Sequence, residues 1–138
     1  MRKAISLIET LAILLIVSLL ALVAASSITK WSGSLKVKNF AEKLVMDLQK
    51  ARSLAYKLGE SKVVINSSSY EIYAPTTKKL WEEKVPDGLS ISSNESEITF
   101  KRNGLPNVNT TIEIEGYKTE YSITVSKISG RIQLEKLK

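Results

Sequence analysis

Residues 1–31 read MRKAISLIETLAILLIVSLLALVAASSITKW, and they predict the first element of the structure. After a short basic start, an almost wholly apolar run extends from Ala4 to Ala25. About 20 apolar residues are enough for a helix to cross the hydrocarbon core of a bilayer. The run therefore predicts a transmembrane helix over 5–31. Lys30 and Trp31 suit its far interface, where an ammonium group and an aromatic ring are both stable.

The two basic residues ahead of the run, Arg2 and Lys3, predict its orientation. Flanking Lys and Arg residues are retained on the cytoplasmic side of a membrane. We therefore expect a single-pass protein of the cytoplasmic (inner) membrane, with its N-terminus in the cytoplasm. Everything after Trp31 is expected to lie outside.

Glu9 is the one acidic residue inside the apolar run. An ionised carboxylate at mid-membrane costs about 2.5–3.5 kcal/mol on insertion scales, and less near the edge. Two interpretations follow. Either Glu9 is shallow enough to reach the headgroups, or a partner supplies a cation when the protein assembles.

The sequence Ala4-Ile5-Ser6-Leu7-Ile8-Glu9 resembles the processing motif of type IV prepilins. In that family a short basic leader is removed by a prepilin peptidase, the new N-terminus is methylated, and a Glu lies four positions further on. The resemblance implies a leader over 1–4, cleavage between Ala4 and Ile5, and an assembly role for Glu9. The family usually has Gly and Phe at the cleavage site, where this chain has Ala4 and Ile5.

The α-amino group freed at Ile5 is the cation that the resemblance implies for Glu9. A carboxylate in lipid is stabilised by a paired cation. In the family this pairing is thought to dock each subunit into a growing filament, so other pilin or pseudopilin subunits are expected partners. The rival interpretation is an ordinary secretory signal cut after Ala25, for which the apolar run is long and Glu9 is out of place.

Residues 32–59 are predicted to form an amphipathic helix. Apolar residues recur at spacings of three and four, which places them on one stripe of a helix: Val37, Ala41, Leu44, Leu48, Ala51, Ala55 and Leu58. Lysines flank the stripe as a solvated face, at positions 36, 43, 50 and 57. Ser32-Gly33-Ser34 is a soft joint, and Gly59 is a helix stop. The small Ala residues favour a helix that covers a β-domain over a free coiled coil.

Residues 60–138 are predicted to be an antiparallel β-domain. Lys62 to Asn66 and Tyr70 to Ala74 flank a run of serines and predict a hairpin. Further segments alternate apolar and polar residues, at Ile98 and Phe100, Ile112 and Ile114, Tyr121 to Val125, and Ile132 and Leu134. Turn signals separate them at Pro86-Asp87-Gly88, Asn103-Gly104, Gly116 and Ser129-Gly130. Roughly six to eight short strands packed on the helix give an α+β fold.

The C-terminal half resembles the GspH/FimT-type minor pseudopilins, and among them the ComGD-type competence pseudopilins. The matching residues are Ile98-Thr99-Phe100, Gly104 to Asn107, Thr111 to Ile114, Ile123 to Val125 and Ser129 to Ile132. The resemblance implies a pilin-like fold and a structural subunit of a filament for DNA uptake in natural transformation, which reaches the cell surface. In relatives from secretion systems and type IV pili, the same fold belongs to a pseudopilus that moves proteins or to a pilus.

DNA is a further candidate partner. Some relatives bind DNA through a Gly-Arg-x-Arg motif, and this chain has Gly130-Arg131-Ile132-Gln133, without the second arginine. Arg131, Lys127, Lys136 and Lys138 could neutralise phosphates. The alternative is a solvated β-hairpin with a basic tail, and a net charge of +6 permits either interpretation.

Nothing in the sequence predicts an enzyme. Cysteine and histidine are absent, so no thiolate or imidazole ligand, nucleophile or base is present. Phosphate-binding glycine loops and the common hydrolase motifs are also absent. We therefore expect no catalytic residues, no metal and no cofactor.

Overall fold

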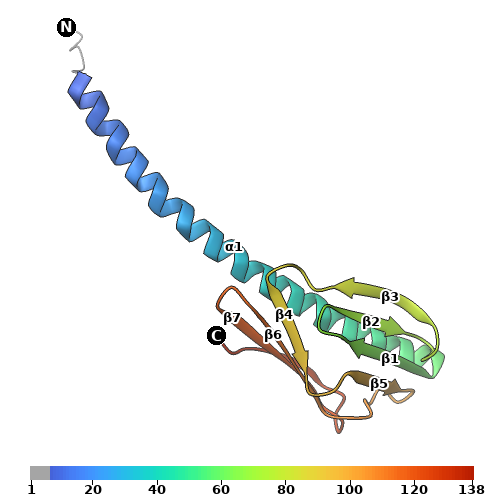
Figure 1. Cartoon of the computed structure of the whole chain (residues 1–138). Coiled ribbons are helices and arrows are strands. Elements are labelled where there is room, and N and C mark those ends of the chain that lie inside the picture. Colours follow the sequence, from blue (N-terminus) through green and yellow to red (C-terminus); the bar gives the residue numbers. More distant parts are fainter. Residues whose placement is uncertain (1–6) are drawn as a thin grey trace. The chain divides into compact units, whose positions relative to one another are not determined.

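The computed structural model describes residues 7–138, and for residues 25–30 the backbone alone. It contains a long helix followed by eight strands (Figure 1). In chain order the elements are α1 (Leu7–Leu58), β1 (Glu60–Ile65), β2 (Ser69–Tyr73), β3 (Lys79–Lys84), β4 (Leu89–Ser93), β5 (Glu97–Lys101), β6 (Thr110–Gly116), β7 (Thr119–Val125) and β8 (Ile132–Lys136). The α+β class predicted from the sequence is confirmed.

The chain divides into two compact units, Met1–Gly33 and Ser34–Lys138. The first unit holds the apolar part of α1, and the second holds the rest of α1 and all eight strands. The boundary falls inside the predicted joint, but the helix is not interrupted there. Intrahelical hydrogen bonding thus outweighs the cost of about 1 kcal/mol that a mid-helix Gly carries relative to Ala.

In the second unit α1 buries the predicted stripe against the sheets. Val37, Ala41, Leu44, Leu48, Ala51 and Ala55 are fully buried, as the spacing predicts. Leu58 was also expected in the stripe, and this is wrong, because it is 52% exposed. Leu58 is the last residue of α1, where the buried stripe ends. Phe40 and Asp47, which lie outside the predicted stripe, are also buried.

The strands form two antiparallel four-stranded sheets, in the orders β3-β2-β1-β5 and β4-β6-β7-β8. The predicted hairpin is present as β1 and β2, with Ile65 opposite Tyr70. The sequence did not identify β3 and β4. Polar residues dominate both, so neither shows the repeated apolar alternation by which the other strands were recognised.

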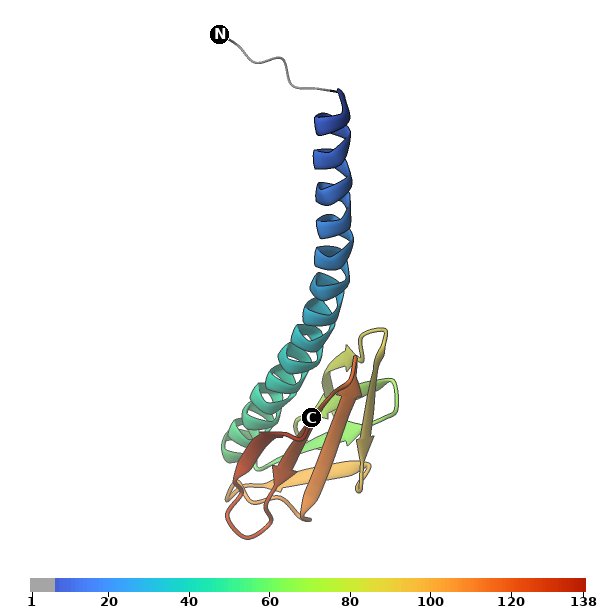
Figure 2. The ribbon, with the colours of Figure 1, turned by 90° about the vertical axis from the view of Figure 1, so that its left-hand side faces the viewer.

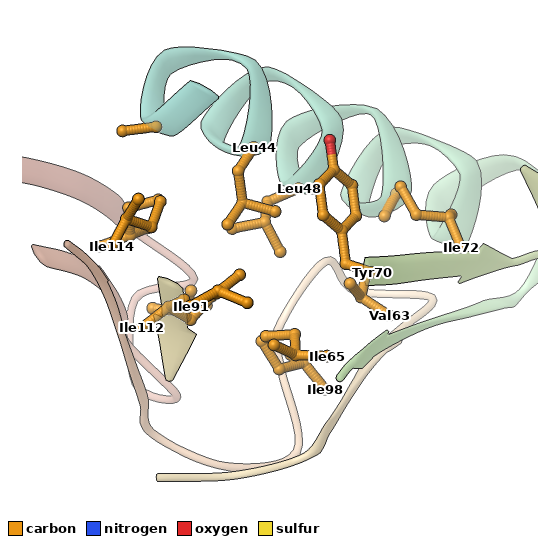
Figure 3. Packing of buried hydrophobic residues seen from close by; sticks show 14 of the residues in the cluster. Leu44, Leu48, Val63, Ile65, Tyr70, Ile72, Ile91, Ile98, Ile112 and Ile114 are labelled. Atoms are coloured by element: carbon orange, nitrogen blue, oxygen red, sulfur yellow. The ribbon is translucent and has the colours of Figure 1, made fainter. Parts of the chain in front are cut away.

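The core lies where the inner faces of both sheets meet α1. Figure 3 shows Leu44 and Leu48 above side chains that come from both sheets, among them Val63, Ile98 and Ile112. Burying one such aliphatic side chain contributes about 1.5–3 kcal/mol. In Figure 2, turned by 90°, the same part of α1 runs along the sheets. The helix is therefore the element that joins the two sheets into one core.

The predicted turns are present. Gly59 ends α1 with a φ of 96°, and its N–H donates to the Ala55 carbonyl over 2.9 Å. Gly88 follows Pro86-Asp87 with a φ of 84°. The hairpin between β6 and β7 is tighter than the sequence suggested, because Tyr117 and Lys118 both have positive φ. Such a two-residue turn matches the twist of the strands that it joins.

Candidate functional site

The apolar part of α1 is long and apolar enough to cross a membrane. The span Leu7–Ala24 has 18 residues, none of them buried. At about 1.5 Å per residue it is some 27 Å long, close to the thickness of a bilayer's hydrocarbon core. Its two hydroxyls are satisfied within the helix, since Thr10 Oγ1 donates to the Leu7 carbonyl and Ser18 Oγ to the Leu14 carbonyl. These are the requirements of a segment surrounded by lipid.

Glu9 lies near the described start of α1 and is exposed. Within residues 7–138, no hydrogen bond or ion pair reaches its carboxylate. In water such a carboxylate would be hydrated, whereas in lipid it needs a cation. The helix thus presents one charged group without a partner in its own described residues. Ala4 and Ile5, the predicted cleavage and methylation residues, lie outside the described part of the chain.

The structure divides the four basic residues predicted to contact DNA into two pairs. Lys127 lies in the turn between β7 and β8, and Arg131 immediately precedes β8. Lys136 ends β8 opposite Tyr121, and Lys138 follows it, on the side of the β6–β7 hairpin. A strand rises about 3.4 Å per residue, so the two pairs lie at opposite ends of β8. They do not form a single patch.

Arg52 and Tyr56, one turn apart on α1, hold two glycine turns together. Arg52 Nη1 donates to the Gly130 carbonyl over 3.0 Å, and its guanidinium lies 6.0 Å from the centre of the Tyr56 ring. A Cβ at Gly104 would collide with the Tyr56 hydroxyl, and one at Gly130 would come within 2.9 Å of the Gly104 carbonyl oxygen. Close contact at both turns therefore requires glycine.

This arrangement brings four exposed cations to one end of the β-domain. Lys101 ends β5 and Arg102 lies in the turn that follows, while the neighbouring turn before β8 carries Lys127 and Arg131. Figure 2 shows both turns beside the C-terminal end of α1, at the lower left. Both turns are predicted from the sequence, but their contact is not. Lys101 and Arg102 were missed because no local pattern places residues 101–104 beside residues 126–131.

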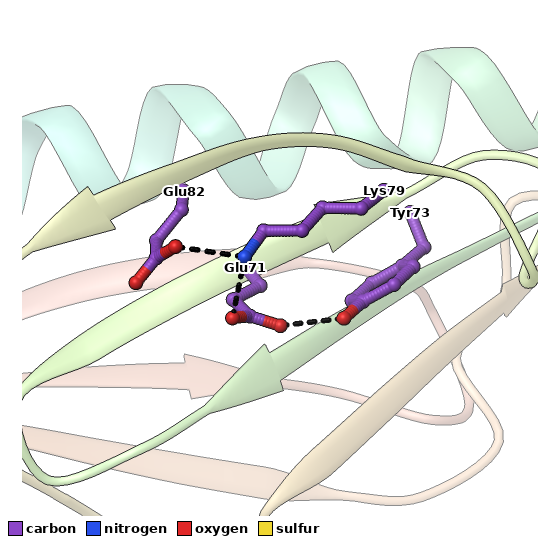
Figure 4. A network of polar contacts seen from close by, with 4 residues as sticks. All are labelled: Glu71, Tyr73, Lys79 and Glu82. Carbon is purple, nitrogen blue, oxygen red and sulfur yellow. Dashed lines mark hydrogen bonds and ion pairs between the residues drawn. The ribbon is translucent and has the colours of Figure 1, made fainter.

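An ion-pair network ties β2 to β3 (Figure 4). Lys79 Nζ lies 2.7 Å from a carboxylate oxygen of Glu71 and 2.7 Å from one of Glu82, and Tyr73 Oη donates to Glu71 over 2.5 Å. The hydrogen bond from Lys79, and then that from Tyr73, lowers the pKa of Glu71. The same Lys79 lowers the pKa of Glu82. All four groups are thus held in their ordinary charge states at neutral pH, which suits a structural link better than proton transfer.

Across residues 7–138, no group of three or more His, Cys, Asp or Glu side chains is placed to hold a metal ion. The features that could carry function are therefore the apolar helix with Glu9 and the basic end of the β-domain. A scan against protein-family models, a search of curated proteins and a search of solved structures all returned no match.

Proposed function

We propose that this protein is a minor pilin-like subunit (a pseudopilin) of a type IV pilus-like filament that serves DNA uptake in natural transformation. The observation that carries the proposal is that the two parts of α1 differ. From Leu7 to Ala24, α1 is exposed, apolar and interrupted by the single carboxylate of Glu9. From Val37 to Ala55 the same helix is the spine of a small antiparallel β-domain.

In this proposal the apolar segment holds the subunit in the inner membrane until it is extracted into a filament. There, the exposed apolar side chains of neighbouring copies replace lipid. The Glu9 carboxylate pairs with the α-amino group that the peptidase frees at Ile5 of a neighbouring subunit. This pairing supplies the cation that the described residues of a single chain do not provide.

The proposal predicts a mature protein that begins at Ile5 and carries an N-methyl group. Intact-mass and N-terminal peptide mass spectrometry of the membrane fraction will measure this, with a strain that lacks the prepilin peptidase as control. A mature N-terminus at Ser26 would establish an ordinary secretory signal and overturn the proposal.

The role in DNA uptake is tested separately from processing. Deleting the gene should abolish transformation by external DNA, and expression of the unaltered chain should restore it. A deletion strain that is transformed normally but fails to export proteins would assign the subunit to a secretion system.

A further inference from the structure

The β-domain carries two exposed surfaces of opposite charge. The first, the basic end, consists of Lys101, Arg102, Lys127 and Arg131, with Tyr56 and Ile128 among them. The second, the outer sheet face, is the solvent side of β4-β6-β7-β8 and consists of Glu113, Glu115, Glu120 and Glu135, with Ser122 at its centre. Within residues 7–138, none of these eight charged groups takes part in an ion pair.

Strand register places the four carboxylates of the outer sheet face together. Glu113 and Glu135 both lie opposite Ser122, one on each side, and therefore point to the same face. Glu115 lies directly opposite Glu120. Like charges directly opposite each other destabilise a sheet. Lys118 and Lys138 line a pocket of about 400 Å³ together with Glu115 and Glu120 at the hairpin end of this face, so the carboxylates farthest from these lysines are Glu113 and Glu135.

The basic end combines charge with exposed apolar surface. Ile128, at the tip of its turn, is 87% exposed, and Tyr56 is 50% exposed. Aromatic and Arg side chains are enriched in the residues that dominate protein interfaces. The one acidic neighbour in register is Glu60, opposite Lys101. An exposed aliphatic tip gains little against phosphates, so the composition favours a protein surface over a nucleic acid.

We infer that the basic end of one copy docks on the outer sheet face of a second copy of this chain. The inference rests on the proposed function, because a filament subunit needs a contact with the subunit beside it. The two surfaces differ, so the contact is head-to-tail and leaves one of each surface free on the pair. Four cations meet four carboxylates, and Ile128 lies over Ser122.

A single contact of this kind is weak. Exposed ion pairs contribute about 0–1 kcal/mol each and are screened by salt. Confinement of every copy to one membrane raises its effective concentration. The contact therefore selects the orientation of neighbours, while the apolar helices supply most of the cohesion.

The test uses the absence of cysteine from the chain, so that any introduced pair reports contact between copies. Full-length Ile128→Cys and Ser122→Cys chains with different tags are produced together, and their membranes are oxidised. We expect a disulfide-linked dimer that carries both tags, and no dimer from either chain alone. Ser67→Cys, exposed in the β1–β2 turn and outside both surfaces, is the control that should not pair with Ser122→Cys.

Charge reversal tests the chemistry of the contact. Adding Arg102→Glu and Arg131→Glu to the Ile128→Cys chain should lower the mixed dimer about tenfold or more, because like charges facing each other across an interface disfavour association. Adding Glu113→Lys and Glu135→Lys to the Ser122→Cys chain should then restore it. Restoration requires that both chains fold, so a folding defect cannot produce the expected result.

Three outcomes would overturn the inference. The first is that no mixed dimer forms, and the second is that Ile128→Cys forms a dimer alone. The third is a mixed dimer that nuclease removes and that Glu113→Lys with Glu135→Lys does not restore after the reversal of Arg102 and Arg131. The last would assign the basic end to DNA. The proposed function fails on a different result, a mature N-terminus at Ser26. A chain that begins at Ile5 but gives no mixed dimer would lose the interface alone.

Discussion

At the scale of single residues, two carboxylates stand in environments where charge is costly. Glu9 lies in a segment that is apolar enough to cross a membrane, and it has no partner among the described residues. Asp47 is 3% exposed inside the core of the β-domain, but it accepts a hydrogen bond from Tyr70 over 2.7 Å and pairs with Lys50 over 3.0 Å. The first carboxylate has no partner within residues 7–138, whereas the second is satisfied by its own fold. We therefore expect one to act in assembly and the other in stability.

We expect Glu9→Leu or Glu9→Val to leave membrane insertion intact and to stop incorporation into filaments. Loss of the charge makes the segment more apolar, so residence in the membrane is unaffected. What is lost is the counter-charge for the amine of a neighbouring copy. Immunoblots of membrane and sheared-filament fractions measure both. Ser18→Ala is the matched control, because that hydroxyl is satisfied within the helix. A Glu9→Leu chain that enters filaments like the unaltered one would exclude the docking role.

We expect Tyr70→Phe to lower the free energy of unfolding of the β-domain by about 1–3 kcal/mol, the cost of leaving a buried group without its hydrogen bond. Burial, and then the hydrogen bond to Asp47, raises the pKa of Tyr70, so its hydroxyl remains a donor throughout the accessible pH range. Guanidinium unfolding of the detergent-solubilised chain, followed by tryptophan fluorescence, gives the value. Tyr73→Phe removes a hydroxyl bonded to a carboxylate on the surface and should cost much less. Equal losses in the two variants would contradict this account.

At the scale of elements, the edge strand β3 is attached by charge as well as by backbone pairing. Lys79 bridges Glu71 of β2 and Glu82 of β3. Paired charges on an edge strand also discourage the addition of a foreign strand. The charged residues of KLWEEK thus keep β3 in register with β2 and discourage another strand from pairing with its outer edge.

We expect the stabilisation from this network to disappear in acid. The pKa values of Glu71 and Glu82 are lowered from an ordinary value of 4.5. Their contribution is therefore complete above that pH and is lost as the pH falls through the lowered values. Lys79→Met should lower the thermal midpoint at pH 7, and the difference from the unaltered chain should shrink below pH 4.5. Lys84→Met, on the same strand and outside the network, is the control. A difference that does not change with pH would show that charge is not its cause.

In the molecule as a whole, the two parts of the single helix α1 suit different surroundings. Its first part is apolar all round, as lipid requires, and its second part is apolar along a single stripe. In that stripe Ala41, Ala51 and Ala55 allow the sheets to approach closely. The Ser61 hydroxyl, for example, donates to the Ala51 carbonyl over 2.6 Å.

We expect Ala51→Leu to loosen the β-domain without releasing the chain from the membrane. A larger side chain in a filled interface costs about 1–3 kcal/mol, since the helix and β1 have to move apart. Limited proteolysis of membranes with the domain accessible should cut this variant faster, while the apolar segment stays in the membrane fraction. Ser53→Leu adds the same bulk at an exposed position of α1 and should be digested like the unaltered chain. Equal resistance of both variants would contradict the close packing.

The elements that could be predicted from the sequence are those whose signal is local. Three such signals are the length of the apolar run from Ala4 to Ala25, the helical spacing of the stripe that begins at Val37, and the alternation around Ile112. The helix, its stop at Gly59 and the α+β class were predicted from local signals of this kind. The sequence did not predict β4, where apolar alternation is weak, and it wrongly placed Leu58, the last residue of α1, in the buried stripe.

Which segments lie next to one another could be seen only in the folded protein. It placed β1 between β2 and β5, and it joined the turns at Gly104 and Gly130 through Arg52. It also set Lys138 and Arg131 at opposite ends of one strand. This is because the periodicity of a helix or strand involves only residues that are close together in the sequence. Strand pairing and surface charge instead depend on which distant segments best bury their apolar faces together.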